Sequence, residues 1–113
     1  VGHRVVHGAD KFSSATVLDA EVIKAVEEAA TLAPLHNPPN LLGIRVAQAV
    51  FHCPHVGVFD TAFHSTIPPE NYTYAIPAKL AAEHRIRRYG FHGTSFCFVT
   101  SATAEKLGMK RTE

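Results

Sequence analysis

The chain has 113 residues, of which 46% are hydrophobic and 19% charged, and its formal net charge is +1. This length and composition predict one small globular domain with a hydrophobic core. The nearly balanced charge argues against a partner that is nucleic acid or a membrane surface, and no apolar run is long enough to cross a bilayer. Cys53 and Cys97 lie among apolar residues and no signal peptide is visible, so we expect reduced, buried thiols in a cytoplasmic protein.

The chain begins with a predicted strand over residues 1–8, because Val5 and Val6 are β-branched. On a strand alternate side chains share a face, so His3 and Val5 would point to one side and Arg4 to the other. A polar loop and a second, shorter strand over residues 15–18 are expected next.

Two helices are predicted to follow these strands. Asp19 is expected to cap the first helix, whose apolar stripe ends at Pro34. Asn37 is expected to cap the second, which would run to about residue 51 with proline at its first position. Apolar residues cover most of the circumference of the second helix, so we expect it to be largely buried.

A third strand, which should be buried, is predicted within the segment H-V-G-V-F-D-T-A-F-H, residues 55–64. Its apolar run is followed at once by Asp60. A carboxylate at the carboxyl end of a buried strand lies where open α/β sheets place their ligand chemistry. The plainer interpretation, that Asp60 caps the next turn, remains open at this point.

The last third of the chain is predicted to hold short elements. Tyr72 and Tyr74 alternate as an edge segment would, residues 78–84 favour a helix, and residues 86–91 favour a short strand. Thr94 or Ser95 is expected to cap a last helix that ends at Leu107, before Gly108. Strands interleaved with helices predict an α/β fold, with too few strands to close a sheet, so we expect part of a larger domain.

Three polar residues stand at element ends and are candidates for chemistry: Arg4, Asp60 and His92. His92 lies between Gly90 and Gly93, which would let the backbone approach a ligand, and precedes a helix N-terminus, which favours an anion. Each residue also has a structural explanation, since Arg4 could be a surface arginine and His92 a buried histidine bonded to backbone.

Two other clusters have alternative interpretations. His3 and His7 are four residues apart, as are Asp60 and His64, which is a spacing used by zinc ligands on a helix. Both pairs lie on or beside strands here, so a zinc site is the weaker hypothesis. A basic group, Arg85, Arg87 and Arg88, could steer nucleotide phosphates, although a solvated basic face is the plainer interpretation.

Four motifs, V-G-H-R-V-V-H-G, A-P-L-H-N-P, F-D-T-A-F-H and R-R-Y-G-F-H-G-T-S, occur in this order along the chain. Together they resemble the acetate kinase family, which includes the propionate kinases. The resemblance implies a two-domain enzyme of the acetate and sugar kinase, heat-shock ATPase and actin superfamily, with ribonuclease H-like α/β cores. It also implies a cytoplasmic homodimer that transfers the γ-phosphoryl of ATP reversibly to acetate or propionate, with Mg²⁺.

The resemblance also implies roles for individual residues. Arg4 matches the family's substrate arginine, Asp60 its catalytic aspartate, and His92 the histidine that contacts the transferred phosphoryl group. The remaining matches concern the acyl substrate: a pocket for the acyl methyl group and a histidine near the active site (Val6, Leu35 and Phe91; His36). No residue here matches a metal ligand or a known nucleotide contact.

Departures from the family pattern limit the expectation. Ala9 stands where the family usually has glycine, and Phe96 where it usually has histidine. Later phosphate and adenosine motifs are not found. We therefore expect residues 1–113 to form the acyl-substrate side of the N-terminal part of such a kinase, without a nucleotide-binding domain and without turnover alone. A non-catalytic remnant that serves as a binding or dimerisation module is the alternative.

Overall fold

The computed structural model describes residues 1–111 and contains a three-stranded sheet at its centre. The strand order is β1-β3-β2, with β1 (Gly2–Val5) parallel and β2 (Thr16–Val17) antiparallel to the central strand β3 (Val56–Phe59). All three strands lie in segments for which the sequence predicts strands. The parallel pairing of β1 and β3 requires a long crossover connection, which the helices between residues 20 and 50 supply.

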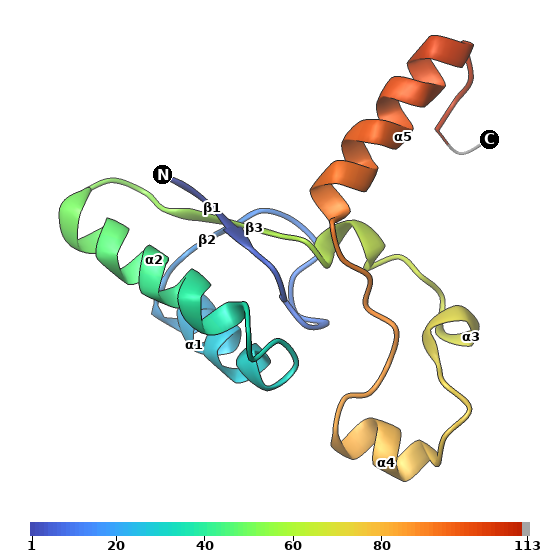
Figure 1. The fold of residues 1–113 in the computed structure, drawn as a ribbon, viewed down its shortest axis with the longest axis horizontal. Coiled ribbons are helices and arrows are strands. Elements are labelled where there is room, and N and C mark those ends of the chain that lie inside the picture. The colour runs from blue at the N-terminus through green and yellow to red at the C-terminus, as the bar shows by residue number, and fades with distance from the viewer. Residues whose placement is uncertain (112–113) are drawn as a thin grey trace.

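The crossover helices cover the sheet and enclose the core (Figure 1). Helix α1 (Ala20–Glu28) continues into the 3₁₀ turn η1 (Ala29–Thr31), and α2 (Asn37–Val50) follows. The carboxylate of Asp19 accepts a hydrogen bond from the Val22 amide at 2.8 Å, which confirms the predicted cap of α1. The buried core comprises apolar residues from both helices and the sheet: Val5, Leu18, Val26, Leu41, Ile44 and Phe59.

The second half of the chain extends away from the sheet (Figure 1). After the 3₁₀ turn η2 (Ala62–His64), the short helices α3 (Pro69–Tyr72) and α4 (Ala78–Glu83) form a separate lobe, and α5 (Gly93–Leu107) projects to the other side. The radius of gyration is 15.9 Å, against about 13 Å for a compact domain of this length. No helix within residues 1–111 has the length and hydropathy to span a bilayer.

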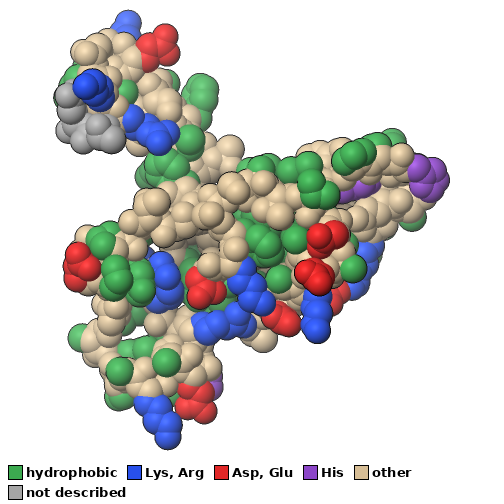
Figure 2. Space-filling view, turned by 180° about the vertical axis from the view of Figure 1, so that it is seen from behind, with side chains coloured by type: hydrophobic (Ala, Val, Ile, Leu, Met, Phe, Trp, Pro, Cys, Tyr) green, Lys and Arg blue, Asp and Glu red, His purple; other side chains and the backbone are tan. Residues whose placement is uncertain are grey.

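The open shape leaves apolar side chains uncovered, which corrects two predictions. Leu42, Val46 and Val50 of α2 are each more than half exposed, because only the side of the helix that carries Leu41 and Ile44 packs on the sheet. Figure 2 shows hydrophobic side chains on the surface of the α5 arm as well. The two thiols are free, as predicted, but neither is buried: Cys53 is exposed and Cys97 is half-buried.

Four further predictions about local structure are wrong. Tyr72 ends α3 and residues 86–91 form a loop, because neither segment pairs with a strand within the described residues. Helix α5 begins at Gly93, with His92 rather than Thr94 or Ser95 in the cap position. Helix α2 has the predicted bounds, but His36 occupies its cap position.

Candidate active site

Asp60 lies immediately after β3, beside the end of the parallel strand β1. The Asp60 amide donates to the carbonyl of Val5 at 3.0 Å, which extends the parallel pairing by one step. Two hydrogen bonds join the side chains of Arg4 and Asp60: Arg4 Nε donates to Oδ1 at 3.1 Å and Nη2 to Oδ2 at 2.7 Å. The hydrogen bond to Asp60 raises the pKa of the Arg4 guanidinium. Asp60 therefore binds a guanidinium. It does not cap the next turn, because η2 begins without a hydrogen bond from a side chain to its first backbone amides.

The pair is asymmetric in its exposure to solvent. The Asp60 side chain is 2% exposed, whereas that of Arg4 is 65% exposed. A buried carboxylate is stable when a cation and hydrogen bonds satisfy it, which Arg4 provides. The carboxylate thus holds one edge of the guanidinium in place, and the rest of the guanidinium is accessible from outside.

His92 reaches the same place from a distant part of the sequence. The Gly93 amide donates to the Asp60 carbonyl at 2.9 Å, and a Cβ at position 93 would lie 2.3 Å from that oxygen. Only glycine permits this approach. His92 itself has φ 55°, a left-handed conformation that turns the chain into α5. The ring nitrogen Nε2 of His64 lies 2.9 Å from the carbonyl of Phe91. This contact holds Phe91, the residue directly before His92, in place.

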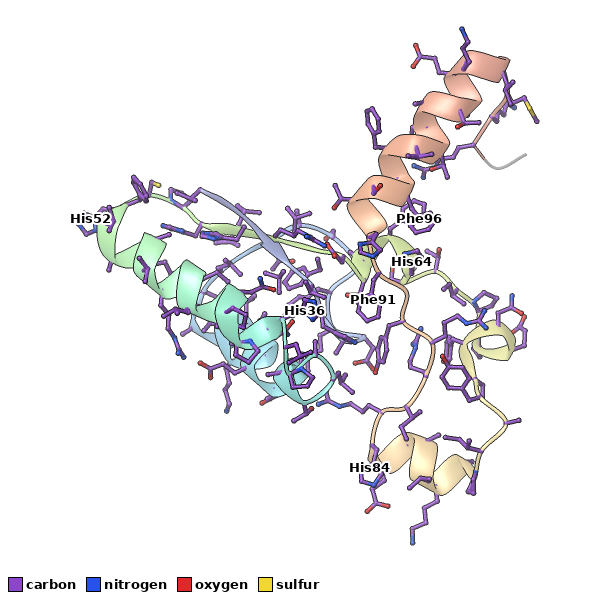
Figure 3. All side chains as sticks on the ribbon, in the orientation of Figure 1. His36, His52, His64, His84, Phe91 and Phe96 are labelled. Carbon is purple, nitrogen blue, oxygen red and sulfur yellow. The ribbon has the colours of Figure 1, made fainter. Side chains whose placement is uncertain are left out.

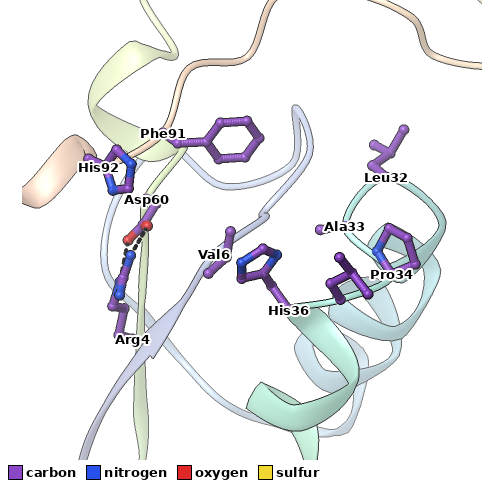
Figure 4. Close-up of a pocket in the computed structure, with 10 residues that line it drawn as sticks. Arg4, Val6, Leu32, Ala33, Pro34, His36, Asp60, Phe91 and His92 are labelled. Carbon is purple, nitrogen blue, oxygen red and sulfur yellow. Dashed lines mark hydrogen bonds and ion pairs between the residues drawn. The ribbon is translucent and has the colours of Figure 1, made fainter.

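Arg4, Asp60 and His92 line a cavity of about 330 Å³. Figure 4 shows Arg4, Asp60 and His92 on one side of it, His36 on the other, Val6 between them and Phe91 beside His92. All seven residues for which the sequence predicts a site role line this cavity: Arg4, Val6, Leu35, His36, Asp60, Phe91 and His92. Leu35 is 83% exposed, so it contributes to the rim rather than the interior.

Three further lining residues were not predicted: Leu32, Ala33 and Pro34. They follow η1 and form an apolar wall opposite the charged pair (Figure 4). Sequence reasoning treated Pro34 as the stop of a helix. The motif A-P-L-H-N-P, which begins at Ala33, was the signal that could have placed Ala33 and Pro34 at the cavity, since it also contains Leu35 and His36. Leu32 lies just before the motif, and no sequence signal marks it.

A buried amide holds the wall that carries His36. Asn37 is fully buried, and its Oδ1 accepts from the His7 amide at 3.1 Å. Its Nδ2 donates to the carbonyls of His7 at 2.9 Å and Val26 at 3.1 Å. The next turn adds a bond from the Val6 amide to Asn40 Oδ1 at 3.0 Å. Asn37 therefore does not cap α2 as predicted, because its side chain satisfies the backbone where β1 has ended.

The histidines named in the zinc hypothesis do not converge. His3 Nε2 lies 2.8 Å from His55 Nδ1, at the far end of the sheet from Asp60. His7 is 1% exposed and lies beneath the rings of Tyr89 and Phe91. Figure 3 shows His64, which the hypothesis also names, and the further histidines His36, His52 and His84 on separate parts of the molecule. Within residues 1–111, no group of three or more His, Cys, Asp or Glu side chains could hold a metal ion.

Burial affects the protonation of two of these histidines. Burial lowers the pKa of His7, and the positive charge of Arg85 lowers it further. The neutral ring also suits its hydrogen bond, because Nδ1 accepts from the Ala9 amide at 2.9 Å. Burial and the neighbouring His55 ring likewise lower the pKa of His3.

The two departures from the family pattern have local consequences. Ala9 has φ 51°, a left-handed conformation that favours glycine, so the loop after β1 keeps the backbone that a glycine would adopt. Phe96 is half exposed, and its ring meets the edge of the His64 ring at a centroid distance of 5.4 Å. Neither departure displaces Arg4, Asp60 or His92 from the cavity.

The fold and the cavity define an α/β protein with a candidate site in the cavity at the carboxyl end of its central strand. The model of the acetokinase family matches residues 1–113. The chain belongs to this family.

Relatives and solved structures agree with that assignment. The chain is 56% identical over 110 residues to acetate kinase from Thermosipho melanesiensis, covering 96% of this chain and 27% of that protein. It is 56% identical over 114 residues to acetate kinase from Thermotoga petrophila, covering 100% and 28%. The chain thus spans little more than a quarter of the length of these relatives.

Two solved structures show the same fold. A propionate kinase from Francisella tularensis superposes with a TM-score of 0.93 at 45% identity, covering 96% of this chain and 29% of that one. Porphyromonas gingivalis acetate kinase superposes with a TM-score of 0.89 at 48% identity, covering 97% and 28%. The predicted α/β fold, matching part of an acetate or propionate kinase, is confirmed.

Proposed function

We propose that this chain forms the acyl-substrate side of a carboxylate kinase, which transfers the γ-phosphoryl group of ATP reversibly to acetate or propionate. The observation that carries the proposal is the cavity itself, in which a guanidinium, a carboxylate and an imidazole face a short apolar wall. A short carboxylic acid has the same two-sided chemistry, with an anionic head and a small apolar tail. Family membership supports the same reaction.

The reaction asks little of the protein in proton transfer. A carboxylic acid with a pKa near 4 is already ionised at neutral pH, so the nucleophile needs no general base. A carboxylate oxygen attacks the γ-phosphorus, the bond from that phosphorus to the β–γ bridging oxygen breaks, and ADP leaves with the electron pair. The difficulty is that two anions must meet, so catalysis consists of positioning and charge stabilisation.

Arg4 and His92 are the groups on this chain that supply positive charge and hydrogen-bond donors at the cavity. Asp60 holds Arg4 through Nε and Nη2, which leaves the remaining donors of the guanidinium for the acyl carboxylate or the phosphoryl oxygens. His92, at the start of α5, donates to an equatorial oxygen of the transferred group. The N-terminal end of that helix also favours an anion.

ATP and Mg²⁺ are part of the proposal as substrate and counter-ion. Asp60 is the one carboxylate among the residues that line the cavity, and no three-ligand metal site exists within residues 1–111. That donor set suits Mg²⁺ held chiefly by nucleotide phosphates and water, which is its usual mode beside triphosphates. Mg²⁺ would neutralise phosphate charge, and we assign the nucleotide contacts to residues outside this chain.

The acyl wall determines which acid is accepted. Val6 and Phe91 line the cavity, and the strongly exposed Leu35 lies at its rim. One methylene in such a pocket changes the free energy of binding by about 1–3 kcal/mol. Acetate and propionate are therefore both substrates in the proposal. A cytoplasmic homodimer is proposed from the family resemblance, and the exposed apolar residues of α2 and α5 support a covered surface.

The proposal is tested by assaying ATP-dependent formation of the acyl phosphate, with Mg²⁺ and with either acetate or propionate, on protein expressed from the complete reading frame that contains these residues. We expect turnover there and none from residues 1–113 alone. Turnover by residues 1–113 would contradict the assignment of nucleotide contacts elsewhere. A folded product of the complete frame that is inactive with both acids would contradict the kinase and favour a binding or dimerisation module.

A further inference from the structure

A second cavity, of about 430 Å³, lies on the other side of Phe91 from the candidate active site and shares Leu32 and Phe91 with it. Its wall combines three arginines with aromatic rings: Arg85, Arg87 and Arg88, with Tyr74, Tyr89 and Phe91. In the part of the chain that the structure describes, no acidic residue lines it. The sequence left open whether these arginines form a solvated face, and the structure places all three at one hollow.

One arginine of this group is held rigidly. The Arg87 guanidinium lies over the ring of Tyr72, with Cζ 3.5 Å from the centroid, and 5.2 Å from the centroid of Tyr89. Its Nε donates to the carbonyl of Arg88 at 3.2 Å. Stacking between aromatic faces fixes the plane of a guanidinium and leaves its edge available for an anion.

The backbone around the other two arginines is held as well. The Arg88 amide donates to the carbonyl of Tyr72 at 2.9 Å, and the Tyr89 hydroxyl donates to the carbonyl of Arg85 at 2.8 Å. The loop of residues 85–89 is thus tied to α3 and to itself. Its arginines project from a fixed frame rather than from a free loop.

Among residues 1–111, none of the three guanidiniums has a carboxylate partner. Within residues 1–111 the ion pairs are Arg4–Asp60, Lys11–Glu28 and Arg45–Glu27, and none includes Arg85, Arg87 or Arg88. Asp10 lines a neighbouring cavity with Arg85 and Arg87, and Glu28, which is paired with Lys11, also feels the charge of Arg85. Figure 2 shows Lys and Arg side chains gathered near the middle of the rear face, with acidic ones beside them. Like charges crowded around a hollow attract an anion.

We propose that this cavity is a second ligand site, which binds a small organic dianion by its charged end among Arg85, Arg87 and Arg88 and by an apolar or aromatic body against Tyr74, Tyr89 and Phe91. Phosphate monoesters and dicarboxylic acids share this chemistry, because arginine binds both kinds of oxyanion through paired hydrogen bonds. The proposal does not rest on the proposed phosphoryl transfer, because its charged groups include neither Arg4 nor Asp60, although the two cavities share Leu32 and Phe91.

The test is calorimetric titration of phenyl phosphate, which is a dianion at pH 7.5, into protein expressed from the complete reading frame. Inorganic phosphate, which lacks the aromatic ring, tests whether that ring contributes to binding. Phthalate distinguishes dicarboxylates from phosphate esters. We expect saturable binding of phenyl phosphate that is at least roughly tenfold tighter than that of inorganic phosphate and weakens with added salt. Equal affinity for the two phosphates would overturn the role of the aromatic wall, and absence of saturable binding would overturn the site.

Variants locate the binding. The double variant Arg85→Gln/Arg88→Gln keeps the stacked Arg87 and should weaken phenyl phosphate binding at least roughly tenfold. The matched control, Arg45→Gln/Lys106→Gln, removes two positive charges elsewhere and should stay within about twofold. Arg4→Gln should also leave binding unchanged, and a loss confined to Arg4→Gln would overturn the proposal by placing the ligand in the first cavity.

A measurement on the unaltered protein guards against misfolded variants. The amide NMR signals of Tyr74, Tyr89 and Gly90, and the ring signals of the two tyrosines, should shift in proportion to the amount of phenyl phosphate bound. Signals of α2 should not move. Shifts that centre on Val6 and His36 instead would contradict the second site.

Discussion

Arg4 and Asp60 lie 56 residues apart in the chain and meet through two hydrogen bonds, Nε to Oδ1 at 3.1 Å and Nη2 to Oδ2 at 2.7 Å. The contact follows from the parallel register of β1 and β3, which pairs Arg4 with Val58 and brings Asp60 to the end of the same two strands. Removing one partner therefore changes the orientation of the other.

Asp60→Asn should reduce the rate of acetyl phosphate formation by roughly 10²–10³-fold, the usual cost of disturbing a preorganised charge in an active site. The amide keeps the shape of the side chain but removes the negative charge that holds Arg4. Initial rates on the product of the complete reading frame check this, with Glu70→Gln as an exposed control. A rate within about threefold of the parent, in a folded variant, would be inconsistent with a role for Asp60.

Gly93→Ala should destabilise the fold by about 2–3 kcal/mol and lower the rate at least roughly tenfold. The new Cβ would lie 2.3 Å from the Asp60 carbonyl, so α5 and His92 must shift. Gly43→Ala is the matched control, because nothing lies within 4 Å of its Cβ and alanine favours a helix interior by up to about 1 kcal/mol. Urea unfolding measures the stability of the two variants. Equal stability of the two variants would show that the close approach is not needed.

Asn37→Ala should cost about 2–4 kcal/mol of unfolding free energy, since it removes three hydrogen bonds and leaves the backbone of His7 unsatisfied in a buried position. Asn71→Ala, at an exposed position, should change stability by less than about 0.5 kcal/mol. The comparison is made by denaturant unfolding at one pH. A loss below about 1 kcal/mol for Asn37→Ala would mean that water replaces its bonds.

Stability should decrease as the pH falls below about 6.5. Burial, with the charge of Arg85, lowers the pKa of His7, and burial with the neighbouring His55 lowers that of His3. The folded state therefore favours the neutral rings, while the unfolded chain takes up protons at its ordinary pKa. Stability is complete above that pH and falls below it, by at most about 1.4 kcal/mol per pH unit for each histidine.

Urea unfolding between pH 7.5 and 5.5 measures that slope. His7→Gln should flatten it, whatever its effect on absolute stability, whereas His84→Gln, at an exposed position, should leave it unchanged. A slope that is the same in His7→Gln as in the parent would assign the pH dependence to other groups.

The sequence was most informative where local chemistry decides structure. The β-branched run before Asp60 and the carboxylate of Asp19 need only their neighbours to form a strand end and a helix cap, and both were predicted correctly. Residues 86–91 have the composition of a strand, yet a strand needs a hydrogen-bonded partner, and the sheet offers none to them within the described residues. Local pattern cannot show whether a partner exists.

The candidate site illustrates the same limit. The motifs placed seven residues at one cavity, but they did not reveal that Asp60 binds Arg4 or that Asn37 satisfies the end of β1. Those contacts join residues 30 and more positions apart and depend on the register of β1 with β3. Leu42 and Val46 were expected to be buried because a helical wheel counts apolar residues without knowing what covers them.

The most direct measurement is the initial rate of ATP-dependent acetyl phosphate formation by Arg4→Gln and by His92→Ala, compared with His84→Ala, on folded protein from the complete reading frame. If the guanidinium and the imidazole act together at the first cavity, each of the two variants should lose at least roughly 100-fold in rate while His84→Ala stays within about twofold. Rates for both variants within a few-fold of the parent would contradict the account.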